Sequence, residues 1–120
     1  MINRYRGDVP FELDGRRIAL RLTLGSLAQL EDAFGTDGLS ALSTRLGEGR
    51  LSARDICHVL AAGFVGAGER HHTGVPMDGE TLGTIIPASA LVQAATCAAA
   101  LLAVTFGGGE FSDPPPPQAA

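Results

Sequence analysis

Three histidines and two cysteines are the first side chains in this sequence to consider for catalysis or metal binding. Cys57 and His58 are neighbours in the chain, which suggests a thiol nucleophile with its base. A helix is predicted for this stretch, and on a helix neighbouring side chains do not face each other, so the two cannot form such a pair. Cys57 and Cys97 are therefore predicted to be small core residues.

The histidines raise a second possibility, a metal site. His71 and His72 are adjacent, and together with His58 and Glu69 they could supply ligands. The ligand spacings typical of zinc sites are not present, and adjacent side chains in regular structure point apart. The sequence therefore predicts no metal site and no cofactor. A small metal-binding or enzymatic domain that uses His58, His71 and His72 is the less favoured alternative.

Composition excludes several further chemistries. Gly66 and Gly68 match the first two glycines of a dinucleotide-binding fingerprint, but a histidine occupies the third position and a predicted helix precedes the motif. All nine basic residues are arginine, so neither a Schiff-base lysine nor a phosphate-loop lysine exists in this sequence. The formal net charge of −4 is unfavourable for a general nucleic-acid binder. These features predict a small acidic protein that is not an enzyme and does not bind nucleic acid.

The clearest potential for binding lies in the alanine-rich interval between Glu80 and Glu110, which contains no charged residue. The helix predicted over residues 87–106 is apolar nearly all round, so it must be central in the core or covered by something else. Exposed apolar patches of several hundred Å² usually mark interaction sites. Both interpretations remain open for this helix. Its predicted partner-binding residues are Leu91, Leu101, Leu102 and Phe106.

The same interval is the only candidate for a membrane-spanning helix. Residues 85–106 are numerous enough, because about 20 residues suffice to cross a bilayer. Pro87 and several polar residues interrupt the stretch, and acidic residues flank it where basic or aromatic anchors are usual. A buried or partner-covered helix is therefore favoured, and no membrane partner is expected.

Residues 8–24 are predicted to form a β-hairpin. Apolar and polar residues alternate on both sides of Asp14-Gly15, a pair that favours a two-residue turn. This turn fixes the register and places Phe11 opposite Ile18. An isolated hairpin is marginal in water, so its apolar face must pack on other elements. The predicted apolar face comprises Val9, Phe11, Ile18 and Leu20, and the opposite face holds the ion pairs Glu12–Arg17 and Asp8–Arg21.

Apolar residues at helical spacing predict five helices, over residues 26–34, 39–46, 53–65, 79–86 and 87–106. The third has the clearest start, because Ser52 and Asp55 are spaced to cap it reciprocally. The first is expected to bury Leu24, Leu27, Leu30 and Phe34 on one side.

These elements predict an α+β fold that is mostly helical, with an N-terminal β-hairpin packed on four to five α-helices. Residues 1–110 are expected to form a single domain. The segment 111–120 contains four consecutive prolines and is expected to be a disordered tail.

Several segments together resemble a known family. They are Leu13–Arg16, Leu20–Glu31 with Phe34-Gly35, Gly49–Asp55 and Gly63–Gly68. This pattern resembles the small tail protein of gene transfer agents and related long-tailed phages, which has been described both as a tail tube protein and as a tail assembly chaperone. The resemblance covers residues 5–68 well and the final helix more loosely.

The resemblance implies a non-enzymatic role in building a phage-like tail, in the cytoplasm of a bacterial producer cell. A chaperone would shield the apolar helices of a tape-measure protein. A structural tail tube or tail-completion subunit, present in phage-like particles, is the alternative. The chaperone is preferred because a tube subunit needs a large closed sheet and the sequence predicts only two strands. The implied partners are a tape-measure protein, a major tail tube protein, or a second copy of this chain.

Overall fold

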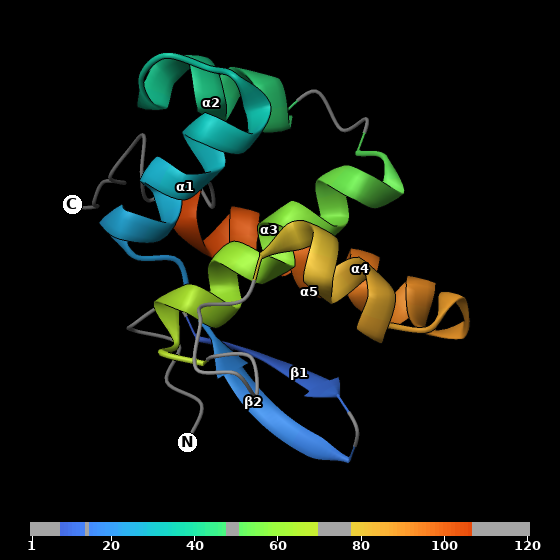
Figure 1. The fold of residues 1–120 in the computed structure, drawn as a ribbon. Coiled ribbons are helices and arrows are strands. Elements are labelled where there is room, and N and C mark those ends of the chain that lie inside the picture. Colours follow the sequence, from blue (N-terminus) through green and yellow to red (C-terminus); the bar gives the residue numbers. More distant parts are fainter. Residues whose placement is uncertain (1–7, 14, 48–50, 70–77, 107–120) are drawn as a thin grey trace, which may run out of the picture.

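The computed structural model describes residues 8–13, 15–47, 51–69 and 78–106 (Figure 1). It has the predicted mostly helical α+β fold, in which an N-terminal hairpin packs against helices. The elements in chain order are β1 (Val9–Leu13), β2 (Arg16–Leu20), α1 (Leu24–Phe34), α2 (Leu39–Gly47), α3 (Ala53–Gly66), α4 (Gly79–Ile85), the 3-10 turn η2 (Ala88–Ala90) and α5 (Leu91–Phe106). The expected tail over residues 111–120 lies outside the described residues.

The hairpin has the predicted antiparallel register, with Phe11 opposite Ile18. Gly15 in the turn has a φ of 77°, a conformation that glycine adopts without steric penalty. The strands are shorter than the expected span of residues 8–24, because β2 ends at Leu20. Beyond that point the amide of Arg21 donates to the carbonyl of Gly63 at 3.3 Å, which turns the chain toward α3.

A partly buried ion pair closes the open end of the hairpin. The Nε atom of Arg21 donates to Oδ1 of Asp8 at 2.8 Å, and the Asp8 side chain is fully buried. Hydrogen bonding to Asp8 raises the pKa of the Arg21 guanidinium. The Asp8 carboxylate is buried and the Arg21 side chain is 24% exposed, so this contact fixes the end of the hairpin more firmly than a fully solvated pair would.

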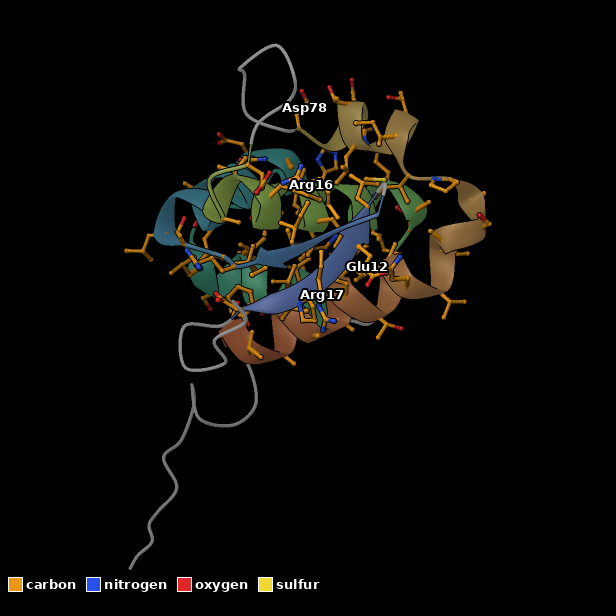
Figure 2. All side chains as sticks on the ribbon, turned by 90° about the horizontal axis from the view of Figure 1, so that it is seen from below. Glu12, Arg16, Arg17 and Asp78 are labelled. Carbon is orange, nitrogen blue, oxygen red and sulfur yellow. The ribbon has the colours of Figure 1, made fainter. Side chains whose placement is uncertain are left out.

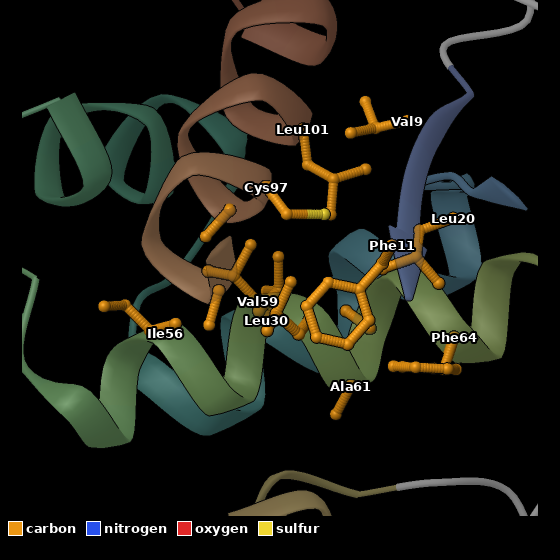
Figure 3. Close-up of a cluster of buried hydrophobic side chains, with 14 of the residues drawn as sticks. Val9, Phe11, Leu20, Leu30, Ile56, Val59, Ala61, Phe64, Cys97 and Leu101 are labelled. Carbon is orange, nitrogen blue, oxygen red and sulfur yellow. The ribbon is translucent and has the colours of Figure 1, made fainter. Parts of the chain in front are cut away.

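The core forms around α3, which contacts α1, α4, α5 and β2. In Figure 3 Val59 and Phe64 lie on the side of α3 that meets the hairpin and α5, whereas the buried Ala61 points to the opposite side. The rings of Phe11 and Phe64 meet edge to face, with centroids 5.9 Å apart. The hairpin is tied to α5 by a further polar contact, in which the amide of Glu12 donates to Oε1 of Gln93 at 3.1 Å. The hairpin and α5 therefore pack around the same central helix.

The start of α3 has the predicted capping box. Ser52 Oγ accepts from the amide of Asp55, and the Asp55 carboxylate accepts from the amide of Ser52. Arg45 on α2 donates to the same carboxylate at 3.0 Å, which links α2 to α3. Burial alone would raise the pKa of Asp55, but these hydrogen bonds outweigh it and lower the pKa.

One expectation about α1 needs correction. Leu24 was expected on the buried side of α1 but is 78% exposed, because it lies about 120° around the helix from the buried Leu30. Ser26 is buried instead, beside the cap residue Thr23. The helix expected over residues 87–106 begins directly after Pro87 with the 3-10 turn η2, which continues without a break into α5.

Gly66, at the end of α3, offers a test of this packing. A Cβ at position 66 would clash with the backbone carbonyl of Arg21, whereas one at Gly47, at the end of α2, would meet nothing. We expect Gly66→Ala to lower the free energy of unfolding by about 2 kcal/mol or more, since the backbone must shift. Gly47→Ala, the matched control, should change it by less than about 1 kcal/mol. Urea titration monitored by circular dichroism measures both, and equal stabilities would contradict the close approach.

Candidate functional site

The helix α5 has one face in the core of the domain. Its buried residues are Ala94, Cys97, Ala98 and Leu101, which follow the i, i+3, i+4, i+7 spacing of a single helical stripe. Leu101 packs beside Leu20 against α3, where a Cβ at Gly63 would lie 3.0 Å from Leu101 Cδ1. Gly63 thus makes room for the close approach of α5.

A second apolar face lies beside the buried one. Seven residues fall within an arc of about 120° around α5, and none of them is fully buried. The arc is as wide as the stripe by which an ordinary amphipathic helix contacts a core. Leu91 is 54% exposed and Val92 is 77% exposed. We call this arc the outer face of α5; it comprises Leu91, Val92, Ala95, Ala99, Leu102, Ala103 and Phe106.

An open groove of about 620 Å³ runs along the C-terminal part of this outer face. α5 forms one wall, α2 forms the other, and Leu51 and Ile56 at the start of α3 contribute the rest. A smaller hollow of about 270 Å³, which also includes Ile56, lies beside Leu91 at the other end of α5. The groove is lined by Ser43, Leu46, Gly47, Leu51, Ile56, Ala95, Ala99, Leu102, Ala103 and Phe106.

Within the described ranges, which leave out residues 48–50 between Gly47 and Leu51, none of the residues that line the groove is charged. The labelled charged residues in Figure 2 lie on other elements, with Arg17 on the hairpin and Asp78 at the start of α4. The exposed pair Arg16–Glu69, 3.2 Å apart, also lies away from the groove residues. A ligand in the groove would therefore be recognised by shape and apolar contact.

Three of the four residues predicted to bind a partner border these hollows. Leu102 and Phe106 line the groove, and Leu91 lines the smaller hollow. Leu101 requires correction, because its side chain is fully buried in the core. Adjacent residues on a helix are separated by about 100°, which places Leu101 inward and Leu102 outward.

Sequence reasoning did not find the other wall of the groove. Ser43, Leu46 and Gly47 belong to α2, which is separated from α5 by more than forty residues. The i, i+3, i+7 pattern of leucines predicted α2 itself, yet a local pattern contains no information on which distant helix it faces. The exposed Val92 was missed because the prediction selected only the larger side chains of the helix.

The histidine and cysteine chemistry finds little support in the described residues. His58 lies beside Asp32 and Asp78 in a polar hollow of about 370 Å³, but no cluster of three metal-ligating side chains occurs in the described ranges. His71 and His72 lie outside them. Burial raises the pKa of the Cys57 thiol, and it raises that of Cys97 to about 12. Neither thiol is activated as a nucleophile, which would need a lowered pKa.

The segment Ala88–Phe106 is long and apolar enough to cross a membrane when judged by length and composition alone. In this structure its inner face forms part of the core around α3. Core helices of soluble proteins pass the same test but are mostly buried, whereas 22% of the most apolar window of this segment is buried, so a single such helix gives only weak support for a membrane function.

These features define a class: a small, mostly helical α+β protein with an apolar groove beside one helix. The family follows from comparison with known proteins. A model of the family described as "phage tail tube protein, GTA-gp10" matches residues 6–108. The chain belongs to this family, so it is a phage tail-related protein of the gene transfer agent type, as its sequence segments indicated. No curated protein and no solved structure matches the chain significantly.

The two leucines at positions 101 and 102 test the division of α5 into faces. Leu101→Ala removes a fully buried side chain and is expected to lower the free energy of unfolding by about 3 kcal/mol. Leu102→Ala removes a side chain that borders the groove and should lower it by about 1 kcal/mol. Chemical denaturation of both variants measures the difference. A larger loss for Leu102→Ala would reverse the assignment of the two faces.

Proposed function

We propose that this protein is a tail assembly chaperone, which covers apolar helices of a tape-measure protein in the cytoplasm of the producing cell. The observation that carries the proposal is the outer face of α5, a second apolar stripe that its own domain leaves accessible. Membership of a phage tail family supports a partner among the other tail components.

The groove has the features of a helix-binding site. Helix-in-groove recognition places the apolar anchors of one helix against an apolar trough on its partner. The groove between α2 and α5 provides such a trough, with Leu46 on one wall and Leu102 on the other. Completing the burial of Leu91, Val92 and Leu102 contributes on the order of 1–2 kcal/mol for each residue. A few anchors of this size give a complex that can dissociate when the tail subunits assemble.

The charge distribution suits a chaperone. The described residues that line the groove are uncharged, so an apolar helix can contact them without burying an unpaired charge of theirs. The chain as a whole has a formal net charge of −4. That charge favours solubility of the protein while it covers an aggregation-prone segment.

Co-expression with a tape-measure protein tests the proposal. Leu91→Asp and Leu102→Asp each place a carboxylate on the outer face of α5, and each is expected to reduce recovery of the tape-measure protein at least about tenfold. Leu24→Asp is the matched control, because Leu24 is 78% exposed on α1 and is not part of the groove. Circular dichroism must show that all three variants fold. Unchanged capture by folded variants at both α5 positions would contradict the proposed surface.

Mass spectrometry of purified particles separates the chaperone from a structural tail subunit. A chaperone leaves before the particle is complete, so its peptides should be absent from intact particles while those of the tape-measure protein are abundant. Stoichiometric amounts of this protein in the particles would instead favour the structural role.

A further inference from the structure

We infer that the groove between α2 and α5 has an occupant in this chain itself, the side chain of Phe111, which follows the end of α5 by five residues. Residues 107–120 lie outside the described residues, and the inference rests on where α5 ends, on the shape of the groove and on the sequence that follows. It concerns the free protein and does not depend on the identity of any tail partner.

The chain leaves α5 at the groove. Phe106 is the last residue of α5, and its side chain lines the groove. Gly107, Gly108 and Gly109 follow directly. Glycine adopts the left-handed conformation that ends many helices and redirects the chain, and three glycines in a row place no side chain in the way of a reversal. A segment that turns back at this point would run along α5 beside the groove.

Phe111 is close enough in the chain to enter the groove. An extended chain advances at most about 3.6 Å per residue, so the five residues from Phe106 to Phe111 span at most about 18 Å. Ala103 and Ala99 lie about 4.5 Å and about 10.5 Å back along α5 from Phe106, at the helical rise of about 1.5 Å per residue. Phe111 therefore reaches the middle of the groove even after part of the segment is used for the turn.

The middle of the groove is shaped for an aromatic ring. α5 presents small side chains there, at Ala99 and Ala103, which are one helical turn apart and both exposed. Leu46 on α2 and Leu51 before α3 border the same groove, whose volume is about 620 Å³. Ser43 is the one polar side chain among the described residues that line it. A phenylalanine ring suits such a site, because it has no polar atom that would need a partner there.

The other phenylalanines show how this domain places such rings. The sequence contains five, and Phe111 is the one beyond the described residues. Phe11 and Phe64 are fully buried, and Phe34 and Phe106 pack against the core. Glycine, acidic residues, serine and proline surround Phe111, a composition typical of segments without a core of their own, in which aromatic residues are rare. A single aromatic side chain in such a segment indicates an anchor.

The short link to α5 makes a weak contact effective. One aromatic ring in a separate peptide would bind the groove poorly, but a short flexible link holds the ring at an effective concentration on the order of millimolar. Docking of this kind is reversible, because the ring is the main contact. A tail partner that uses the groove must first displace Phe111, a consequence that rests on the proposed function.

Disulfide formation within one chain tests the position of the segment. Ser112→Cys, next to the proposed anchor, is combined either with Ala103→Cys in the groove or with Val104→Cys, which is exposed on α5 but does not line the groove. Cys57 is replaced by serine, and Cys97 is kept because it is buried and its thiol pKa is raised to about 12. The pair at position 103 should close at least about fivefold faster, although position 104 is nearer in the chain, because docking concentrates the segment over the groove.

Phe111→Ser in both double-cysteine proteins is the control for the anchor. It should bring the two rates within about twofold of each other, since the segment then has no large apolar side chain to bury in the groove. Equal rates with Phe111 present would overturn the inference. So would a preference for position 103 that Phe111→Ser leaves unchanged.

Binding of the neutral apolar dye Nile red to the full chain tests the occupancy of the groove. Phe111→Asp should lower the dissociation constant of the dye about threefold or more, because a competitor binds in proportion to the fraction of open sites. Gln118→Asp is the matched control, since it adds the same charge to the same segment and removes no apolar side chain. Adding Leu102→Asp to Phe111→Asp should remove the gain, because Leu102 lines the groove. Unchanged dye binding by Phe111→Asp, folded by circular dichroism, would overturn the inference.

The outcomes also separate this inference from the proposed function. A protein that shows no docking of Phe111 and still captures the tape-measure protein removes the inference and leaves the chaperone role. Docking as described without any capture has the opposite meaning.

Discussion

The structure depends on one constraint: α5 is apolar on more of its surface than this small domain can bury. α5 has sixteen residues and none of them is charged, so it presents apolar side chains on more than one side. The hairpin and the remaining helices pack around α3 and do not surround α5. Only the face that includes Ala98 and Leu101 enters the core. The outer face and the groove between α2 and α5 both follow from this constraint. Larger domains bury a greater fraction of their surface on folding, so they can cover more of such a helix.

Much of the fold was predictable because the signals that specify it are local. The Asp14-Gly15 pair predicted the turn and with it the register of Phe11 and Ile18. Ser52 and Asp55 predicted the capping box, since three residues separate a cap from its reciprocal partner. The family was also evident from short segments. In each case the residues that interact are close in sequence or joined by one tight turn.

The candidate site was predictable only in part, because it depends on the direction in which each side of a helix points after packing. The sequence identified α5 as apolar nearly all round but did not separate Leu101 from Leu102, whose environments differ completely. It placed Leu24 inside, although the contact between α1 and α3 lies elsewhere on the helix. The α2 wall of the groove is a long-range pairing, which local periodicity cannot specify.

The hydrogen bond from the amide of Glu12 to Gln93 has one more consequence, for how the hairpin behaves in a crowded cell. An edge strand usually presents unpaired backbone amides, and a strand of another chain can pair with them and start aggregation. In β1 the two outward positions are Pro10, which has no amide hydrogen, and Glu12, whose hydrogen is already engaged. Within β1, this edge of the sheet therefore offers no amide donor to an incoming strand.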